Sequence, residues 1–305
     1  MADGADERDE RARAAELLAD APPVLWINMA RSAERRARME GELAALGLAG
    51  RARRVEAVDG ADLRAHGERH GVHVVPHASG SAYENACAAS HVLAMLTFLM
   101  EAPADEPRAL VVEDDASLAE YAPYWRKSLG RYLEATRAAA AAAPGSPAPG
   151  ITQLAVMVAD SADLAALDPE AGVPRARANW FSTAAYVVER WAADAIVRAF
   201  VFALADRDGR RTGGVVVDLS RSPCVVHADI LLYSLVPTWT LPLVTYTCDT
   251  SYIHPGHLGG HGRHKAELLE WWQARRCARR CARRCAADHA EERERESRTA
   301  LDGSR

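Results

Sequence analysis

The sequence has very little lysine and no long apolar run. Lysine occurs only at Lys127 and Lys265, so almost all of its 37 basic residues are arginine. The 42 acidic residues leave a formal net charge of -5, which argues against a general nucleic-acid-binding protein, because such proteins carry a basic excess. No stretch approaches the roughly 18 apolar residues of a membrane-spanning helix, and the charged N-terminus lacks the apolar segment of a secretory signal. We therefore expect a cytoplasmic or otherwise intracellular protein without a transmembrane segment.

The length of 305 residues, 49% of them hydrophobic, is enough for one large domain or two small ones. The charge pattern predicts a charged N-terminal extension over residues 1–21, a core domain over 22–265 and a charged helical tail over 266–305. Without a secretory route, the cysteines are expected to be free thiols in a reducing compartment. They are Cys87, Cys224, Cys248, Cys277, Cys281 and Cys285.

One short stretch carries the strongest chemical signal. Residues 109–112 are apolar and are followed directly by Glu113, Asp114 and Asp115. The apolar part is typical of a buried strand, and α/β sheets carry their sites where strands end. Three adjacent carboxylates repel one another, so either a divalent cation or full solvation at a loop tip must hold them together. We interpret the cluster as a metal or substrate site.

The first part of the chain has the pattern of a β-α-β unit. The compact apolar run 24–29 predicts a buried strand. Ser32 can cap a helix with Met39, Leu43 and Leu46 on its apolar side. Residues 54–58 predict a second strand that ends in the turn Asp59-Gly60. This arrangement is typical of the start of a nucleotide-binding α/β sheet.

The rest of the chain continues the alternation of helices and strands. Residues 61–82 predict a short helix and a loop with solvated histidines, and 83–100 a helix so apolar all round that it must be buried. His91 in this helix is either a satisfied core histidine or a support for the nucleotide site. Further strands are predicted at 151–158, 184–188 and 241–247, and further helices at 125–143, 189–205 and from about 228. The predicted fold class is α/β, with one central mixed sheet flanked by helices.

Several of these stretches together resemble glycosyltransferase family 25, the group of lipooligosaccharide and collagen-type galactosyltransferases. The resemblance covers about residues 22–260, and it departs from the family pattern at Met29-Ala30, Ala86 and His227, where Leu-Asp, Gly and Pro are usual. It implies a GT-A-like fold, a UDP-linked sugar donor and an inverting transfer of a hexose to a hydroxyl on a glycan or protein. The matching stretches are 26–32 with Arg35, Arg36 and Met39, then 57–60, 87–91, 110–115, 184–188 with Ala192-Ala193, and 227–229.

In such an enzyme a divalent metal stabilises the leaving diphosphate, and hard ions such as Mn²⁺ or Mg²⁺ prefer carboxylate oxygens. Residues i and i+2 of an extended segment point the same way. Glu113 and Asp115 are therefore the predicted metal ligands, most simply for Mn²⁺, while Asp114 faces the sugar or the other sheet face. A further ligand is expected from His254, in a histidine-rich stretch that could equally be a mobile surface loop.

Inversion also needs a base that deprotonates the attacking hydroxyl. Asp229 is the candidate, although its place before an apolar helix is also that of a plain N-terminal cap. Asn28, Arg31, Asp59 and His91 are the predicted contacts to the nucleotide donor. Arg31 could instead only solvate a helix face.

Other functions remain open at this point. A phosphorelay receiver domain also places acids after a strand, but it needs a lysine that only the distant Lys265 could supply. A metal-dependent nuclease lacks its lysine after Asp115. A non-catalytic nucleotide-sugar-binding module is the main alternative, because Glu113 replaces the first acid of an Asp-x-Asp motif.

The tail repeats Cys277, Cys281, Cys285 and His289 at steps of four residues. On a helix the first and last lie about 18 Å apart, so they cannot share one tetrahedral ion. The repeat predicts a helical stripe flanked by arginines, which could touch a membrane surface or an acidic partner.

Overall fold

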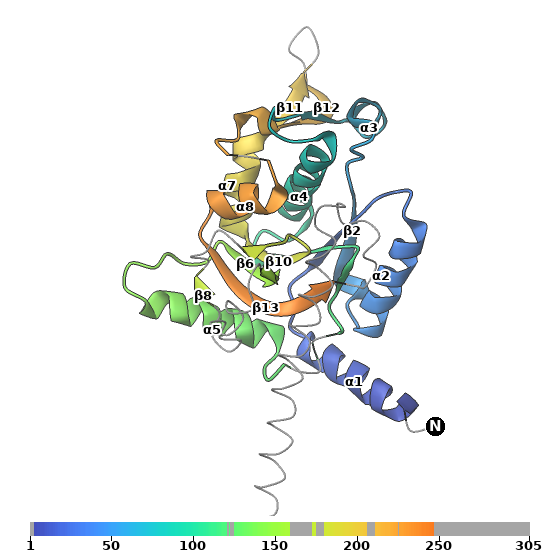
Figure 1. Ribbon diagram of the computed structural model, residues 1–305, viewed down its shortest axis with the longest axis vertical. Coiled ribbons are helices and arrows are strands. Elements are labelled where there is room, and N and C mark those ends of the chain that lie inside the picture. The colour runs from blue at the N-terminus through green and yellow to red at the C-terminus, as the bar shows by residue number, and fades with distance from the viewer. Residues whose placement is uncertain are drawn as a thin grey trace, which may run out of the picture.

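The computed structural model describes residues 3–120, 122, 125–158, 173–174, 180–205, 211–224 and 226–246 (Figure 1). His254, the histidine-rich stretch around it and the tail at 266–305 lie outside these residues. The helices are α1 (Asp3–Leu17), α2 (Ala33–Ala45), α3 (Leu63–His70), α4 (Ala82–Glu101), α5 (Leu129–Ala142), α7 (Arg190–Phe200) and α8 (Ala228–Leu235). The strands are β1 (Val24–Asn28), β2 (Ala52–Glu56), β3 (Val72–Val75), β4 (Arg108–Glu113), β5 (Ala116–Ser117), β6 (Ile151–Ala155), β7 (Met157–Val158), β8 (Val173–Pro174), β9 (Trp180–Phe181), β10 (Ala185–Glu189), β11 (Val201–Ala205), β12 (Arg211–Asp218) and β13 (Thr238–Tyr246).

A central mixed sheet organises the molecule. Its strand order is β2-β1-β4-β10-β6-β13-β5, and β8 pairs with β13. Strand β1 runs parallel to β2 and β4, whereas β10 runs antiparallel to β4 and β6. The predicted α/β class with a mixed sheet flanked by helices is confirmed.

Each face of this sheet is covered by helices (Figure 1). The side chains of β4 alternate between two cores, as strand geometry requires. Leu110 and Val112 pack with residues of α1, α2 and α5, whereas Ala109 and Val111 pack with residues of α4, α7 and α8. The next residue on the second face is Glu113, so the sheet directs its carboxylate toward α4.

Helix α4 is the buried helix predicted from its composition. A capping box defines its start: Ser81 accepts from the Glu84 backbone N–H, and the Glu84 side chain accepts from the Ser81 N–H. Most of its side chains are buried, including His91 at 1% exposure. The Ser90 hydroxyl accepts from the Val58 N–H at 2.9 Å, which fixes the loop after β2 against the helix.

A second, smaller sheet was not predicted. Strand β12 pairs with β3 in parallel and with β11 in antiparallel. The predicted loop after α3 therefore contains a strand, and the predicted helix 189–205 ends at Phe200. Short strands of this kind owe their stability to cross-strand pairing, which local sequence does not reveal.

The prediction of solvated histidines was wrong for His66, which is buried at 3% exposure. Burial lowers the pKa of His66.

The charged N-terminal extension forms helix α1, and its last part packs onto the core. Ala14 and Leu18 are fully buried, and an Arg13 guanidinium nitrogen donates to the Trp125 carbonyl at 3.3 Å. The predicted boundaries at residues 21 and 265 stay predictions.

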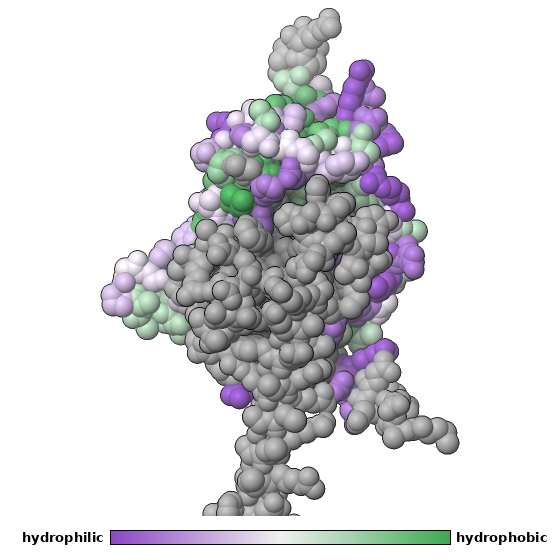
Figure 2. Space-filling view, viewed as in Figure 1, coloured by the Kyte–Doolittle hydropathy of each residue, from purple (hydrophilic) through white to green (hydrophobic). Residues whose placement is uncertain are grey.

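Figure 2 shows hydrophilic surface along the edge where Figure 1 places α2 and α3. The polar face of α2 thus meets solvent, while Met39 and Leu43 are buried beneath it. Within the described part of the chain, no helix combines the length and apolar character that a membrane crossing requires.

Candidate active site

A cavity of about 240 Å³ lies where β1, β2 and β4 end. The amino-terminal half of α4 forms its opposite wall. Ends of neighbouring parallel strands are the usual place for a ligand in an α/β sheet. The cavity is lined by Ile27, Asn28, Met29, Arg31, Arg35, Ala57, Val58, Gly60, Tyr83, Ala86, Cys87, Ser90, His91, Glu113 and Asp114.

Asn28 and Asp114 hold each other on one wall of the cavity. The Asn28 side-chain amide donates to Asp114 Oδ2 at 2.7 Å, and Arg35 donates to Asp114 Oδ1 at 2.9 Å. Arg54 in turn donates to Asn28 Oδ1 at 3.0 Å. Because both oxygens of Asp114 are bonded and its exposure is only 7%, this carboxylate mainly fixes Asn28 and Arg35.

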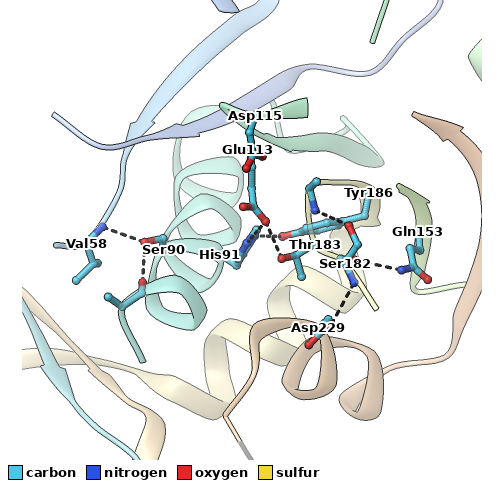
Figure 3. A network of polar contacts seen from close by, with 12 residues as sticks. Val58, Ser90, His91, Glu113, Asp115, Gln153, Ser182, Thr183, Tyr186 and Asp229 are labelled. Atoms are coloured by element: carbon cyan, nitrogen blue, oxygen red, sulfur yellow. Dashed lines mark hydrogen bonds and ion pairs between the residues drawn. The ribbon is translucent and has the colours of Figure 1, made fainter. Parts of the chain in front are cut away.

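Glu113 lies at the centre of a buried polar network (Figure 3). Its Oε1 is 3.2 Å from His91 Nε2 and accepts from the Thr183 hydroxyl at 2.7 Å. The other nitrogen of His91 is 3.2 Å from the Tyr186 hydroxyl. Burial opposes the ionisation of Glu113, but its contacts with His91 and Thr183 outweigh burial, so the pKa of Glu113 is lowered. His91 is therefore both a satisfied core histidine and the support of an acidic group in the cavity.

Asp115 carries the most perturbed carboxylate of this cluster. Burial, and then the negative charge of Glu113, raise the pKa of Asp115 to about 7. Arg35 lies 3.8 Å away and offsets only part of this effect. Two neighbouring carboxylates that disfavour each other's charge fit a divalent cation, since an ion between them relieves the repulsion.

Arg31 and Asp59 form an ion pair beside the cavity. The hydrogen bond from Arg31 lowers the pKa of Asp59, and Asp59 also accepts from the Ala61 N–H at 2.9 Å. Arg31 is 57% exposed in its side chain, so its positive charge remains available to an anion that enters the cavity.

Asp229 reaches the network through a strained turn. Its Oδ2 accepts from the Ser182 N–H at 3.1 Å, and its Oδ1 accepts from the Ile230 N–H at 2.8 Å. Ser182 has a φ of 110°, a conformation that costs energy for a residue other than glycine. Gln153 and Tyr233 both donate to the Ser182 carbonyl, at 3.1 and 2.5 Å. The turn places Thr183 against Glu113, so Asp229 is joined to the acidic cluster through two neighbouring residues (Figure 3).

Sequence reasoning missed several members of the network. Ser182, Thr183 and Tyr186 lie 69 or more residues beyond Glu113 in the chain and reach it because β10 pairs with β4. The only local signal was a Ser-Thr pair just before the buried strand. Cys87 was also not assigned a role, although its sulfur and the ligand atoms of His91 and Glu113 lie within 4.8 Å of one another. Burial raises the pKa of this thiol well above its ordinary value.

The predicted site residues are thus placed in three ways. Asn28, Arg31, His91, Glu113 and Asp114 line the cavity. Asp59, Asp115 and Asp229 contact residues of its wall or of the network behind it. The remaining one, His254, lies outside the described residues.

Comparison with known proteins identifies the family. No curated protein matches the sequence. A family model described as "Glycosyltransferase family 25 (LPS biosynthesis protein)" matches residues 21–205. The match covers β1, β4, α4, Thr183 and β10, which carry the cavity and its acidic network, and the mixed sheet flanked by helices is consistent with a GT-A-like glycosyltransferase fold. The chain therefore belongs to glycosyltransferase family 25.

Proposed function

We propose that this glycosyltransferase moves a hexose, galactose or glucose, from a UDP-linked donor to a hydroxyl group on a glycan or protein. The transfer is inverting and is assisted by a divalent metal, Mn²⁺. One observation carries the proposal: the cavity at the ends of β1, β2 and β4 combines a polar, partly cationic wall with an acidic cluster. A nucleotide diphosphate and its counter-ion need both features.

The donor contacts follow from the cavity lining. Arg31 offers a positive charge to the diphosphate, and Asn28, at the end of β1, is the proposed contact for the nucleotide. Asp59, held by Arg31, is the contact for the ribose. His91 acts through Glu113, because its ring lies between that carboxylate and Tyr186.

Glu113 and Asp115 are the proposed ligands of the metal, together with His254. When bound, the ion would stabilise the negative charge of the departing diphosphate. The raised pKa of Asp115 supports this assignment, since burial and then the negative charge of Glu113 disfavour its ionised form, and a cation at this point would favour it.

Asp229 is the proposed base, and Asp114 the residue that positions Asn28 and Arg35. The support for Asp229 is its place in the first turn of α8 and its link to Glu113 through Ser182 and Thr183. The helix dipole stabilises negative charge at this end of a helix, and a carboxylate that acts as a base accepts the proton on such a charge. Asp114 is buried at 7% exposure, whereas Asp229 is only partly buried, and the Asp114 oxygens accept from the side chains of Asn28 and Arg35.

The test is the release of UDP from UDP-galactose and UDP-glucose, with and without Mn²⁺. We expect metal-dependent release that is lost in Asp115→Ala. Release should be kept in Asp105→Ala, which changes an exposed carboxylate just before the opposite end of β4. Binding of UDP without release would instead favour a non-catalytic nucleotide-sugar-binding module. A protein that does not bind UDP at all would overturn the proposal.

A further inference from the structure

Three different metal-binding groups meet at the base of the cavity. Cys87 and His91 are four residues apart in α4 and therefore share one face of the helix. Glu113 reaches the same point from the end of β4. Their sulfur, nitrogen and oxygen atoms lie within 4.8 Å of one another, and all three residues line the cavity. The proposed sugar transfer uses Glu113 but has no role for the thiol.

The surroundings orient the imidazole for coordination. The Tyr186 hydroxyl lies 3.2 Å from His91 Nδ1, and His91 Nε2 points toward Glu113 and the cavity. A hydroxyl can either donate or accept. In the ion-bound state the ring proton would be on Nδ1, where the Tyr186 oxygen accepts it, and Nε2 would bind the ion in place of its contact with Glu113. Such an outer hydrogen bond is the usual support of a metal-bound histidine.

We propose that Cys87, His91 and Glu113 form a binding site for a thiophilic divalent ion of the zinc class. Thiolate and imidazole ligands select such ions over Mn²⁺, which prefers oxygen. Three protein ligands leave the fourth tetrahedral position open to the cavity. Binding forms a metal–sulfur bond while the thiol proton passes to solvent, and no redox change is involved.

The dimensions are close to those that this ion requires. Ligand atoms about 2.0–2.3 Å from a tetrahedral ion lie about 3.3–3.8 Å from each other. The nitrogen of His91 and the oxygen of Glu113 are already 3.2 Å apart. The Cys87 sulfur is within 4.8 Å of both, so it would have to approach them by at most about 1 Å.

The site shares Glu113 with the metal of the proposed sugar transfer. A zinc-class ion at Cys87 and His91 would therefore compete with Mn²⁺ at Glu113 and Asp115. This consequence rests on the proposed function, whereas binding of the zinc-class ion does not.

The test is titration of the full chain with Co²⁺, a spectroscopic substitute for Zn²⁺ that gives a near-ultraviolet charge-transfer band when a thiolate binds it. We expect a band that Zn²⁺ abolishes and Mn²⁺ does not. Cys87→Ser should remove it, while Cys224→Ser, the other described free thiol, should leave it unchanged. An identical band in the Cys87→Ser protein would overturn the inference. To silence the other thiols, the titrated chain carries Cys248→Ser, Cys277→Ser, Cys281→Ser and Cys285→Ser.

A second measurement needs no substitution at the site. Alkylation of each cysteine is followed by peptide mass spectrometry with and without Zn²⁺. We expect Zn²⁺ to slow alkylation of Cys87 by at least about tenfold, by analogy with the 10–100-fold effects of disturbing metal sites, and to leave Cys224 unaffected. Equal rates at Cys87 would contradict the proposal, and so would a Cys87 that resists alkylation in both samples and gives no cobalt band.

The zinc-class site and the proposed sugar transfer can be refuted independently of each other. A cobalt band without any UDP release would leave the zinc-class site intact and reject the transferase proposal. UDP release without a cobalt band would leave the transferase proposal intact and reject the zinc-class site. If both hold, Zn²⁺ should inhibit UDP release, and Cys87→Ser should make the enzyme less sensitive to it.

Discussion

Replacing Asp229 by asparagine separates a catalytic base from a structural cap. Asparagine keeps a side-chain oxygen that can accept from the Ser182 N–H, so the turn at Ser182 keeps its partner. The structural loss is the carboxylate's charge at the start of α8, about 0.3–1 kcal/mol, and the hydrogen bond from the Ile230 N–H, which would face an amide NH2 in place of an oxygen, about 1 kcal/mol. Loss of a general base instead lowers the rate by about 10²–10⁴-fold.

We therefore expect Asp229→Asn to release UDP at least about 100-fold more slowly than the parent, with donor binding and folding nearly unchanged. The assay is the initial rate of UDP release at saturating donor and Mn²⁺. Urea unfolding shows whether the loss of stability stays within about 2 kcal/mol.

Asp229→Ala is the matched control, because it removes the acceptor as well as the charge. The Ser182 N–H then loses its partner at a cost of about 1–3 kcal/mol, and the strained turn loosens. If Asp229→Asn keeps its rate to within about tenfold of the parent while Asp229→Ala loses it, Asp229 only positions the turn, and its assignment as the base is wrong.

Two further predictions concern stability. The pKa of Asp115 is raised from its ordinary 3.8 to about 7, so the folded protein holds this proton more tightly than the unfolded chain, and stability without metal falls as pH rises between those values. We expect a fall of roughly 2–4 kcal/mol, which Asp115→Asn removes, measured by urea unfolding between pH 4.5 and 7.5. Gly60→Ala should destabilise the protein by about 1–3 kcal/mol and weaken UDP binding, because its Cβ would lie 2.7 Å from the Tyr83 Cα. Gly41→Ala is the control for Gly60→Ala: nothing lies within 4 Å of its Cβ, so it should instead stabilise α2 by about 0.5–1 kcal/mol, as seen in the urea midpoint.

Each of these predictions has an outcome that contradicts it. A flat stability profile in the parent protein would mean that Asp115 is not held protonated by Glu113. An unchanged midpoint and UDP affinity in Gly60→Ala would mean that the backbone at Tyr83 moves aside easily. Adding Mn²⁺ at pH 7 should restore stability to the parent and not to Asp115→Asn, if the ion binds at this carboxylate.

The elements with strong local patterns were predicted closely. Strand β1 covers 24–28 of the predicted run 24–29, and α4 extends the predicted 83–100 by one residue at each end. Both elements are largely buried on all sides, so they consist mainly of apolar residues, and such a run can be recognised from the sequence alone. Strands β3 and β11 were missed, because short and partly exposed strands depend on the partner strand β12 for their stability.

The candidate site divides in the same way. Asn28, Glu113 and His91 could be proposed from sequence, since each lies at a strand end or in a buried helix beside one. The hydrogen bonds of Asp114 could not be predicted from sequence. Its partner Arg35 lies in α2, and only the packing of α2 onto the sheet brings Arg35 close to Asp114. Thr183 contacts Glu113, and Tyr186 contacts His91. Both residues come close to these groups only when the chain folds.

By itself, the sequence determined the family, the α/β class, the buried strand that ends in three acids and the helix that carries Cys87 and His91. These follow from local composition, which dictates which segments are buried and where strands end. Only the tertiary structure decided which groups meet. The antiparallel pairing of β10 with β4, in the register that sets Ala185 opposite Val112, brings Thr183 and Tyr186 to Glu113 and His91. Strand register is set by packing across the whole sheet rather than by the residues of one strand.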